Sequence, residues 1–145
     1  MGSLPGLKVV RSKIHGYGVI ATRIFRQGEI IAEVDGIAWH EGELRDDTYA
    51  LWIDDDMYFD MVDQTRWINH SCNPNSEVKG ERDTRGGAWA HIVASRDIRI
   101  DEEITYDYGF PLHLAEPCLC GVPNCRRFIV AEEELPKLYA QGPQT

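Results

Sequence analysis

Residues 66–75 read Arg-Trp-Ile-Asn-His-Ser-Cys-Asn-Pro-Asn, and this stretch decides the fold expected of the chain. It places an amide, an imidazole, a hydroxyl, a thiol and a second amide next to one another. Consecutive side chains point apart in both a helix and a strand, so residues 69–72 cannot share one face of a regular element. Pro74 favours an extended conformation of the residue before it, and Asn-Pro-Asn is typical of a turn. The residue types alone fit a functional loop and a hydrogen-bonded buried turn equally well.

Two distant stretches favour a functional role for this segment. Glu-Glu-Ile-Thr-Tyr-Asp-Tyr-Gly-Phe spans residues 102–110, and Cys-Leu-Cys-Gly-Val-Pro-Asn-Cys spans residues 118–125. With His-Gly-Tyr-Gly at 15–18, these blocks resemble the SET-domain protein lysine methyltransferases, and the resemblance runs from about residue 6 to about residue 128. Each string alone is weak evidence, whereas the ordered combination is specific. The tail is most similar to the post-SET segment of the trithorax-type branch.

The resemblance implies a mostly β, β-clip-like SET fold. Such a fold has several small sheets, a C-terminal pseudoknot and a zinc-stapled post-SET tail, and the pseudoknot brings residues 69 and 108 into one pocket. Frequent short strands separated by turn signals also favour a mostly β protein without reference to any family. The expected organisation is a SET domain over residues 1–113, a post-SET zinc-binding segment over 114–130 and a C-terminal tail over 131–145.

Composition and charge restrict the class of protein and partner. The chain has 145 residues, 43% of them hydrophobic, which is enough for one soluble domain with its own core. We find no signal-peptide pattern and no apolar run near the roughly 18–20 residues of a membrane span, so an intracellular location is expected, cytoplasmic or nuclear according to the organism. The formal charge of −9 argues against nucleic acid as the main partner. It suits a basic protein or peptide substrate, possibly a histone tail, although solubility alone explains the charge as well.

Local patterns predict individual strands, turns and one short helix. Strands are expected at residues 7–11, 19–22, 29–39 in part, 49–53, 57–62 and 88–96. Polar connections are expected at residues 40–47, 79–87 and 97–101, a short helix limited by Pro136 at residues 131–139, and disorder at residues 141–145.

The sequence departs from the family pattern in two places. The segment from Asp60 to Arg66 is shorter than in the family pattern and lacks its Gly-Asn pair. The resemblance therefore does not define the floor of the substrate cleft. Asp101 stands where the family usually has glycine. The run Asp54-Asp55-Asp56 is most simply a solvated turn, and the alternative is an acidic rim that attracts a basic peptide.

The glycines near the N terminus are candidate cofactor contacts. A lone Gly-x-Gly is more often an ordinary hairpin turn than a ligand loop. In SET domains the corresponding backbone lines the S-adenosylmethionine pocket, so the resemblance implies that Gly16, Tyr17 and Gly18 contact this cofactor.

The resemblance assigns further cofactor contacts to later segments. Asn69 is expected to offer its side-chain amide and its backbone, and His70 its backbone amide to the adenine. Leu119 and Phe128 lie on the cysteine-rich tail and are expected to cover the adenine and the substrate channel, with ordinary packing as the alternative.

The cysteines indicate a structural zinc site. Cys118, Cys120 and Cys125 supply three thiolates, and a structural zinc takes four ligands in a tetrahedron. The only other cysteine in the sequence is Cys72, so one four-cysteine site accounts for every thiol. SET enzymes with a post-SET zinc likewise take their fourth ligand at this position. The alternative is a set of free thiols with Cys72 in the core.

Two tyrosines are the candidate catalytic residues. Tyr108 matches the catalytic tyrosine of the family, and Tyr106 matches a position that influences how many methyl groups are added. Two residues apart on a strand, the side chains point to the same face. We expect mono- or dimethylation, because a phenol at position 106 can retain a water where a further methyl would sit. Taken alone, Tyr-Asp-Tyr fits two aromatic core residues.

Arg66 is expected to have a structural role: it would pair with an acidic neighbour and hold the turn.

The sequence therefore predicts an S-adenosylmethionine-dependent protein-lysine N-methyltransferase with one structural zinc. A competing hypothesis is a catalytically inactive SET-fold module that still binds peptide. A third is a zinc-stapled interaction domain that binds no cofactor.

Overall fold

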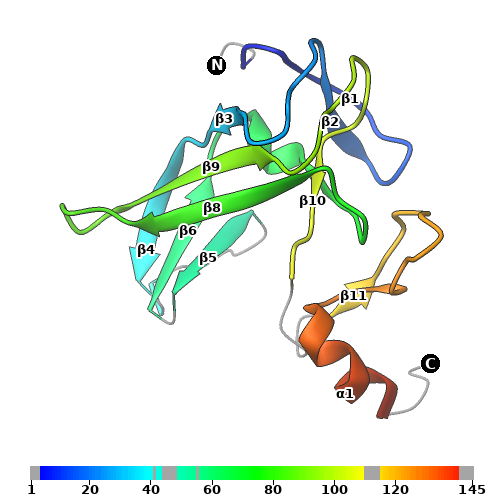
Figure 1. Ribbon diagram of the computed structural model, residues 1–145. Coiled ribbons are helices and arrows are strands. Elements are labelled where there is room, and N and C mark those ends of the chain that lie inside the picture. Colours follow the sequence, from blue (N-terminus) through cyan, green and yellow to red (C-terminus); the bar gives the residue numbers. More distant parts are fainter. Residues whose placement is uncertain (1–3, 41, 44–48, 55, 110–114, 141–145) are drawn as a thin grey trace.

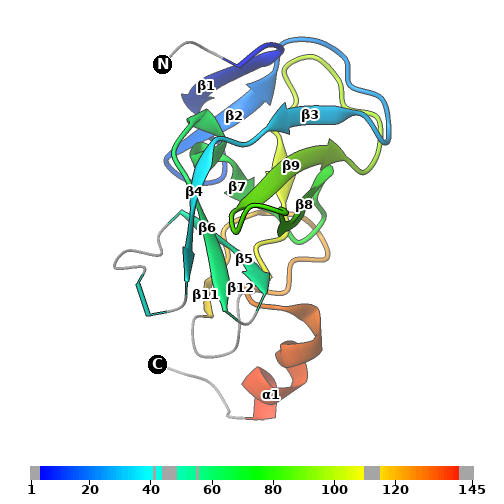
Figure 2. The same ribbon diagram turned by 90° about the vertical axis from the view of Figure 1, so that its left-hand side faces the viewer.

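The computed structural model describes residues 4–40, 42–43, 49–54, 56–109 and 115–140, and it is built from small, twisted sheets (Figures 1 and 2). The strands are β1 (Leu7–Arg11), β2 (Tyr17–Ala21), β3 (Ile30–Glu33), β4 (Gly36–His40), β5 (Ala50–Asp54), β6 (Met57–Met61), β7 (Asn69–His70), β8 (Ser76–Arg82), β9 (Ala88–Ala94), β10 (Thr105–Tyr106), β11 (Glu116–Pro117) and β12 (Phe128–Ile129). The helical segments are η1 (Gln64–Trp67), η3 (Glu132–Glu134) and α1 (Leu135–Ala140). The mostly β, multi-sheet architecture expected from the sequence is confirmed.

The N-terminal sheet is the antiparallel pair β1–β2, which buries Leu7, Val19 and Ala21. Strand β1 has the predicted bounds, whereas β2 begins two residues earlier than predicted, at Tyr17. Both Gly18 and the residue before it therefore belong to a strand. In both views this hairpin lies at the opposite end of the molecule from α1 (Figures 1 and 2).

The central sheet has the order β3–β9–β8. The predicted strand at residues 88–96 is confirmed as β9, and it buries Ala90, Ile92 and Ala94. The prediction of a polar loop over residues 79–87 was wrong in its first half, because β8 pairs with β9 as far as Arg82. Strand β8 lies at the edge of this sheet, and its charged side chains face solvent. Its sequence therefore lacks the apolar alternation by which the other strands were predicted.

The third sheet has the order β4–β6–β5 and places alternate side chains of β6 in the core. Met57, Phe59 and Met61 are buried, as expected for a strand with one inward face. At the β5–β6 turn, both Asp54 and Asp56 pair with the guanidinium of Arg82. That pairing lowers the pKa of Asp54 to about 2 and favours the turn interpretation of the acidic run over a free acidic rim. Asp55 lies outside the described residues, as does most of the expected connection at 40–47.

The short segment that leads into residues 66–75, called the central motif below, forms a capped turn. Asp63 is 4% exposed and N-caps η1, since its carboxylate accepts from Thr65 N–H at 2.9 Å and from Asp35 N–H at 2.8 Å. Capping by a buried carboxylate fixes the short segment that leads into residues 66–75. Asp101, which stands where the family usually has glycine, adopts a φ of 70°, the left-handed conformation that favours glycine.

Two segments far apart in the sequence cross beside the central motif. Strand β10 pairs in parallel with β7, and the chain just before it bonds to β2 through Ile104 N–H and Val19 O at 2.7 Å. Asn75 is 2% exposed and fixes the crossing: its Nδ2 donates to Glu103 O at 2.8 Å and its Oδ1 accepts from Thr105 N–H at 3.0 Å. The arrangement agrees with the expected pseudoknot.

The C-terminal part folds back as a separate small unit. Strands β11 and β12 pair antiparallel, and η3 runs directly into α1. Pro136 occupies the first turn of α1, where its missing N–H costs no helical bond, so the predicted short helix forms. The expected boundary at residues 113/114 and the tail at 141–145 lie outside the described residues. Among the described residues no helix is long and apolar enough to cross a membrane.

Candidate functional site

One cavity gathers most of the residues singled out from the sequence. It has a volume of about 590 Å³ and lies where β2, β7 and the start of β5 meet the cysteine-rich tail. Its lining residues are Ile14, His15, Gly16, Tyr17, Tyr49, Arg66, Trp67, Asn69, His70, Tyr108, Glu116, Pro117, Cys118, Leu119 and Ile129. The fold thus brings segments around residues 15, 69, 108 and 118 to a single hollow.

The side chain of Asn69 holds the first of these segments in place. Its Nδ2 donates to the carbonyl oxygens of His15 at 3.1 Å and Tyr17 at 2.9 Å, and to Glu103 Oε2 at 2.9 Å. All three partners are acceptors, which fixes the orientation of the amide. The nitrogen of the predicted cofactor-binding amide is therefore engaged within the protein. The Oδ1 and the backbone of Asn69 remain the groups that can face a cofactor.

Glu103 is a site residue that the sequence analysis missed. Its carboxylate accepts from Asn69 Nδ2 at 2.9 Å and from Ser12 Oγ, which lies 2.8 Å from Oε1 and 2.9 Å from Oε2. Gly18 is required beside it, because a Cβ there would come within 2.5 Å of Glu103 Oε2. The only sequence signal was the position of Glu103 next to the Ile-Thr-Tyr-Asp-Tyr run, and it gave no hint of the partner 91 residues earlier.

The loop between β1 and β2 presents its backbone to the cavity. Gly16 has a φ of 49°, and no described atom lies within 4 Å of the position a Cβ would take, so this turn is open toward a ligand. Tyr17 is 53% exposed and packs edge-on against Trp67, with ring centroids 6.1 Å apart. Both features suit a wall for a flat ligand.

The two candidate catalytic tyrosines are neighbours but occupy different environments. Their ring centroids are 4.9 Å apart, but the prediction of a shared strand was wrong, because β10 ends at Tyr106 and Tyr108 follows it outside the strand. Tyr108 lines the cavity, and its hydroxyl donates to the carbonyl oxygen of Ile68. Tyr106 is 6% exposed, belongs to the core and is absent from the cavity lining. Burial raises the pKa of both phenols, so both are protonated at neutral pH.

His70 connects this region to the cysteines. Its ring is buried, with Nδ1 3.1 Å from the backbone nitrogen of Tyr108 and Nε2 3.4 Å from Cys72 Sγ. Burial is the main cause that lowers the pKa of His70 to about 4, so the ring is neutral at physiological pH. The Asp107 carboxylate, 3.6 Å from Nδ1, raises this pKa but does not offset burial.

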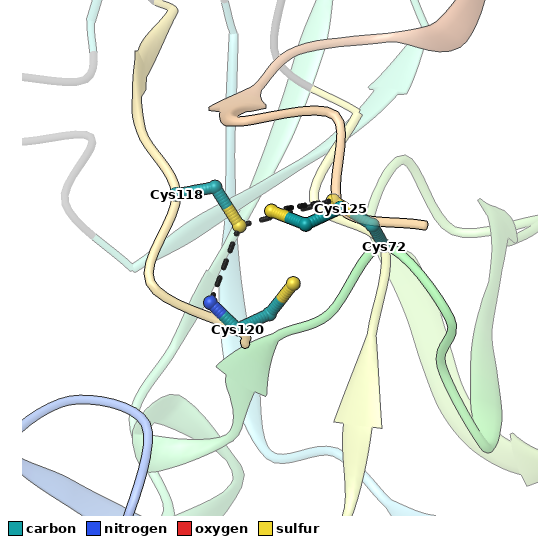
Figure 3. A group of neighbouring side chains, drawn as sticks. All are labelled: Cys72, Cys118, Cys120 and Cys125. Carbon is teal, nitrogen blue, oxygen red and sulfur yellow. Dashed lines mark hydrogen bonds between the residues drawn. The ribbon is translucent and has the colours of Figure 1, made fainter. Parts of the chain in front are cut away.

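The four cysteines form the metal-ligand cluster predicted from their spacing. Figure 3 shows their sulfur atoms turned toward one another, and all four lie within 4.8 Å of each other. Cys72 Sγ is 3.8 Å from Cys118 Sγ and 4.0 Å from Cys125 Sγ. Four thiolates around one zinc at about 2.3 Å would stand roughly 3.8 Å apart, so the donor set and spacing fit zinc.

Backbone groups already surround the cysteine cluster. Arg126 N–H donates to Cys72 Sγ at 3.3 Å, and Arg127 N–H donates to Cys125 Sγ at 3.3 Å. Such donors stabilise negative sulfur, as outer-shell contacts do in metal sites. The side chain of Arg126 also pairs with Asp107 at 2.8 Å, which ties the tail to the segment that carries Tyr108.

The remaining predicted residues are placed as follows. Leu119 is 61% exposed on the rim of the cavity, in a position to cover a ligand. Ile129, rather than the predicted Phe128, lines the cavity. No acidic partner of Arg66 is found in the described ranges; its guanidinium instead lies over the ring of Tyr49 at 4.3 Å. Stacking on an aromatic face thus holds this turn.

A family model for the SET domain matches residues 16–109. The chain belongs to the SET domain family. The matched range includes the Gly-x-Gly turn, the central motif and both tyrosines, and it ends before the cysteine-rich tail. This SET domain is therefore established up to residue 109, and the post-SET motif rests on the cysteine geometry alone.

Curated relatives of this SET domain are histone-lysine N-methyltransferases. It is 31% identical, over 94% of its length, to an H3 lysine-36-specific enzyme of Candida albicans, of which it covers 19%. It is 37% identical, over 83% of its length, to human histone-lysine N-methyltransferase 2B, of which it covers 5%. An H3 lysine-4-specific enzyme of Schizosaccharomyces pombe is 35% identical over 81% of this chain, which covers 14% of that enzyme. The lysine-4-specific relatives support the resemblance to the trithorax-type branch.

Solved structures agree with the fold. KRYPTONITE bound to mCHH DNA, an H3(1–15) peptide and SAH aligns with a TM-score of 0.73 and 28% identity, over 85% of this chain and 29% of that one. KRYPTONITE bound to mCHG DNA and SAH aligns with a TM-score of 0.74 and 29% identity, over 85% and 28% of the two chains.

Proposed function

We propose that this SET domain is an S-adenosylmethionine-dependent protein-lysine N-methyltransferase that acts on a histone or another basic protein. The observation that carries the proposal is one cavity that is lined by Gly16, Tyr17, Asn69 and Tyr108, whereas Gly18 lies behind this lining against Glu103 and Asn69. The chain spans between 5% and 19% of the relatives described above, so their activities support the proposal without establishing it.

The cofactor would lie along the N-terminal part of the cavity. The open backbone of Gly16 and Tyr17, the Oδ1 and backbone of Asn69, and the backbone of His70 can contact it, while Leu119 covers it from the tail. When bound, S-adenosylmethionine supplies an electrophilic methyl group on a sulfonium. A neighbouring structure that contains SAH supports this assignment.

The substrate lysine must arrive as a neutral amine. A free lysine has a pKa of about 10.4, so at neutral pH it is almost entirely protonated. The aromatic walls of Tyr49, Trp67 and Tyr108 remove the side chain from water, and burial beside a positive charge lowers the pKa of an amine. Water can carry the proton away, and the extended basic segment around the lysine would add as a strand along the domain.

Tyr108 would align the reacting atoms. Because its hydroxyl proton is directed at the Ile68 carbonyl, the lone pairs of the phenol oxygen can accept C–H···O contacts from a methyl group. The raised pKa keeps the phenol neutral, so it orients the amine rather than acting as a phenolate base. Fixed geometry of this kind accelerates a displacement by holding both reactants in line.

The four cysteines would hold one structural zinc, whose ligand positions connect the central motif with the tail. Metal binding would then fold residues 118–128 over the cavity. We further propose mono- or dimethylation, because the phenol of Tyr106, next to Tyr108, can retain a water where a further methyl group would sit. In Tyr106→Phe, mass spectrometry should show a shift of the product toward trimethyl-lysine. A histone substrate implies a nuclear location, whereas another basic protein leaves the cytoplasm open.

The decisive experiment is methyl transfer by the zinc-loaded protein. It would be incubated with methyl-labelled S-adenosylmethionine and a panel of core histones and other basic proteins, beside Tyr108→Phe. We expect transfer by the parent and a loss of roughly a hundredfold or more in the variant, the scale of removing one aligned polar group. Without transfer, calorimetry with S-adenosylhomocysteine decides: no binding sinks the proposal, and tight binding restricts it to substrates outside the panel.

A further inference from the structure

The ring of His70 stands between the candidate catalytic tyrosine and the cysteine cluster. Nδ1 lies 3.1 Å from Tyr108 N, and Nε2 lies 3.4 Å from Cys72 Sγ. The ring is also edge-on to the ring of Tyr108, with centroids 5.5 Å apart. The His70 side chain is 2% exposed, so neither nitrogen can exchange its partner for bulk water.

These two contacts decide which nitrogen carries the proton. A backbone N–H only donates, so Nδ1 must present its lone pair to Tyr108. A neutral imidazole then holds its one proton on Nε2, where it faces Cys72 Sγ. The carboxylate of Asp107 is an acceptor and would favour a proton on Nδ1, but it lies 3.6 Å from Nδ1, beyond hydrogen-bond distance, and pairs with Arg126 at 2.8 Å.

We propose that His70 is a positioning residue that couples the four-cysteine cluster to the alignment of Tyr108; this inference rests on the function proposed above. Metal ligation requires Cys72 as a thiolate, and a charged acceptor strengthens the bond from Nε2–H. That bond keeps the proton on Nε2 and therefore keeps the Nδ1 lone pair directed at Tyr108. Tyr108 is then held at two points, by His70 at its backbone and by the Ile68 carbonyl at its hydroxyl.

The pairing of β7 with β10 fixes the position of Tyr108 relative to His70. His70 and Tyr106 are register partners in the parallel pair β7–β10, so the strand that leads to Tyr108 is fixed relative to the histidine. Cys72 follows only two residues later. A displacement of the cysteine cluster would thus move or rotate the ring, and the ring would release the backbone of Tyr108.

Two substitutions separate the two contacts. In His70→Asn the amide oxygen can replace Nδ1 as acceptor for Tyr108, but no donor reaches Cys72. In His70→Gln the amide nitrogen can replace Nε2 as donor to Cys72, but the acceptor for Tyr108 is lost. Both variants must retain the parent's circular dichroism spectrum, which shows that a difference between them is not general unfolding.

The variants should divide metal binding from turnover. For His70→Asn we expect zinc affinity, measured by competition with a chromogenic chelator, to fall about 10- to 100-fold. For His70→Gln we expect zinc affinity close to that of the parent and, at saturating zinc, a kcat several-fold lower than that of His70→Asn. Parental zinc affinity in His70→Asn, or equal losses of both properties in the two folded variants, overturns the inference.

A spectroscopic measurement tests the inference without turnover. In protein labelled with ¹⁵N-histidine, the resonances of His70 should show a protonated Nε2 and an unprotonated Nδ1 at neutral pH. An imidazolium, or the proton on Nδ1, overturns the inference. Because the tautomer and the zinc affinity are read without methyl transfer, a failure of the proposed function is distinguishable from a failure of this one.

Discussion

Asn69 and Glu103, 34 positions apart, share a hydrogen bond of 2.9 Å directly beneath Gly18. The same Nδ2 of Asn69 reaches the carbonyl oxygens of His15 and Tyr17. At the proposed cofactor site, the Glu103 carboxylate therefore holds the Asn69 amide, and this amide holds the backbone of the N-terminal turn.

Replacing Glu103 by glutamine should loosen this wall. In one orientation the new amide nitrogen would face Asn69 Nδ2 donor to donor. In the other orientation it could donate to Ser12 Oγ, but the bonds from Asn69 and Ser12 would no longer be to a charged acceptor, so charge-assisted bonding is lost in both cases. Such bonds contribute about 1.5–3 kcal/mol, and we expect at least a tenfold weaker binding of S-adenosylhomocysteine by calorimetry. Glu77→Gln is the matched control, because the Glu77 side chain is 55% exposed. Equal affinities of the two variants would show that Glu103 has no part in cofactor binding.

A methyl group at position 18 should have a related effect by a steric route. The Cβ of Gly18→Ala would meet Glu103 Oε2 at 2.5 Å and Asn69 Nδ2 at 3.1 Å, so one of them must move. Overpacking of this kind costs about 1–3 kcal/mol, and part of it should appear as weaker binding of S-adenosylhomocysteine. Gly28→Ala lies outside the cavity lining, has no described atom within 4 Å and serves as a comparison that carries only the cost of a positive φ. The prediction fails if Gly18→Ala binds the ligand as tightly as the parent.

Removal of the metal should abolish methyl transfer and spare most of the strands. Elemental analysis is expected to find one zinc per chain, and a chelator should remove both the zinc and the activity. The core around Phe25, Ile92 and Ile98 contains none of the cysteines, so the far-ultraviolet circular dichroism of the sheets should persist. Zinc added back should restore transfer. A chain purified without zinc that still transfers methyl groups, or a loss of strand signal on chelation, would contradict this expectation.

The stability of the crossing should depend on the ionisation of Glu102. Burial raises the pKa of this carboxyl, but donors from Arg96, Asn75 and Arg99 outweigh burial and hold the pKa below its ordinary value of 4.5. The folded state thus favours the charged form, which stabilises the protein above pH 4.5 and loses this contribution as the pH falls through the lower folded pKa.

Glu102→Gln therefore should lower the free energy of unfolding by about 2 kcal/mol at pH 7, as for bonds to a charged group. The difference from the parent should shrink in denaturant titrations at progressively lower pH, below 4.5. A difference that stays constant with pH would assign the effect to packing rather than to charge.

The sequence by itself predicted most of the local elements and named the candidate ligating and catalytic groups. Alternation and β-branched residues predicted β1, β6 and β9, because a strand with one buried face imposes a period of two. The count of four cysteines predicted one metal cluster, because four thiolates match the coordination of zinc.

Only the tertiary structure decided which groups serve one another. The crossing of β10 beside β7 brings Glu103 to Asn69 and Tyr108 to His70, contacts between segments 34 and 38 residues apart that no local pattern encodes. Charged strand β8 and the stacking of Arg66 on Tyr49 likewise depend on neighbours supplied by distant segments. Local periodicity specifies where a side chain points, whereas the partner it meets is fixed by the packing of the whole chain.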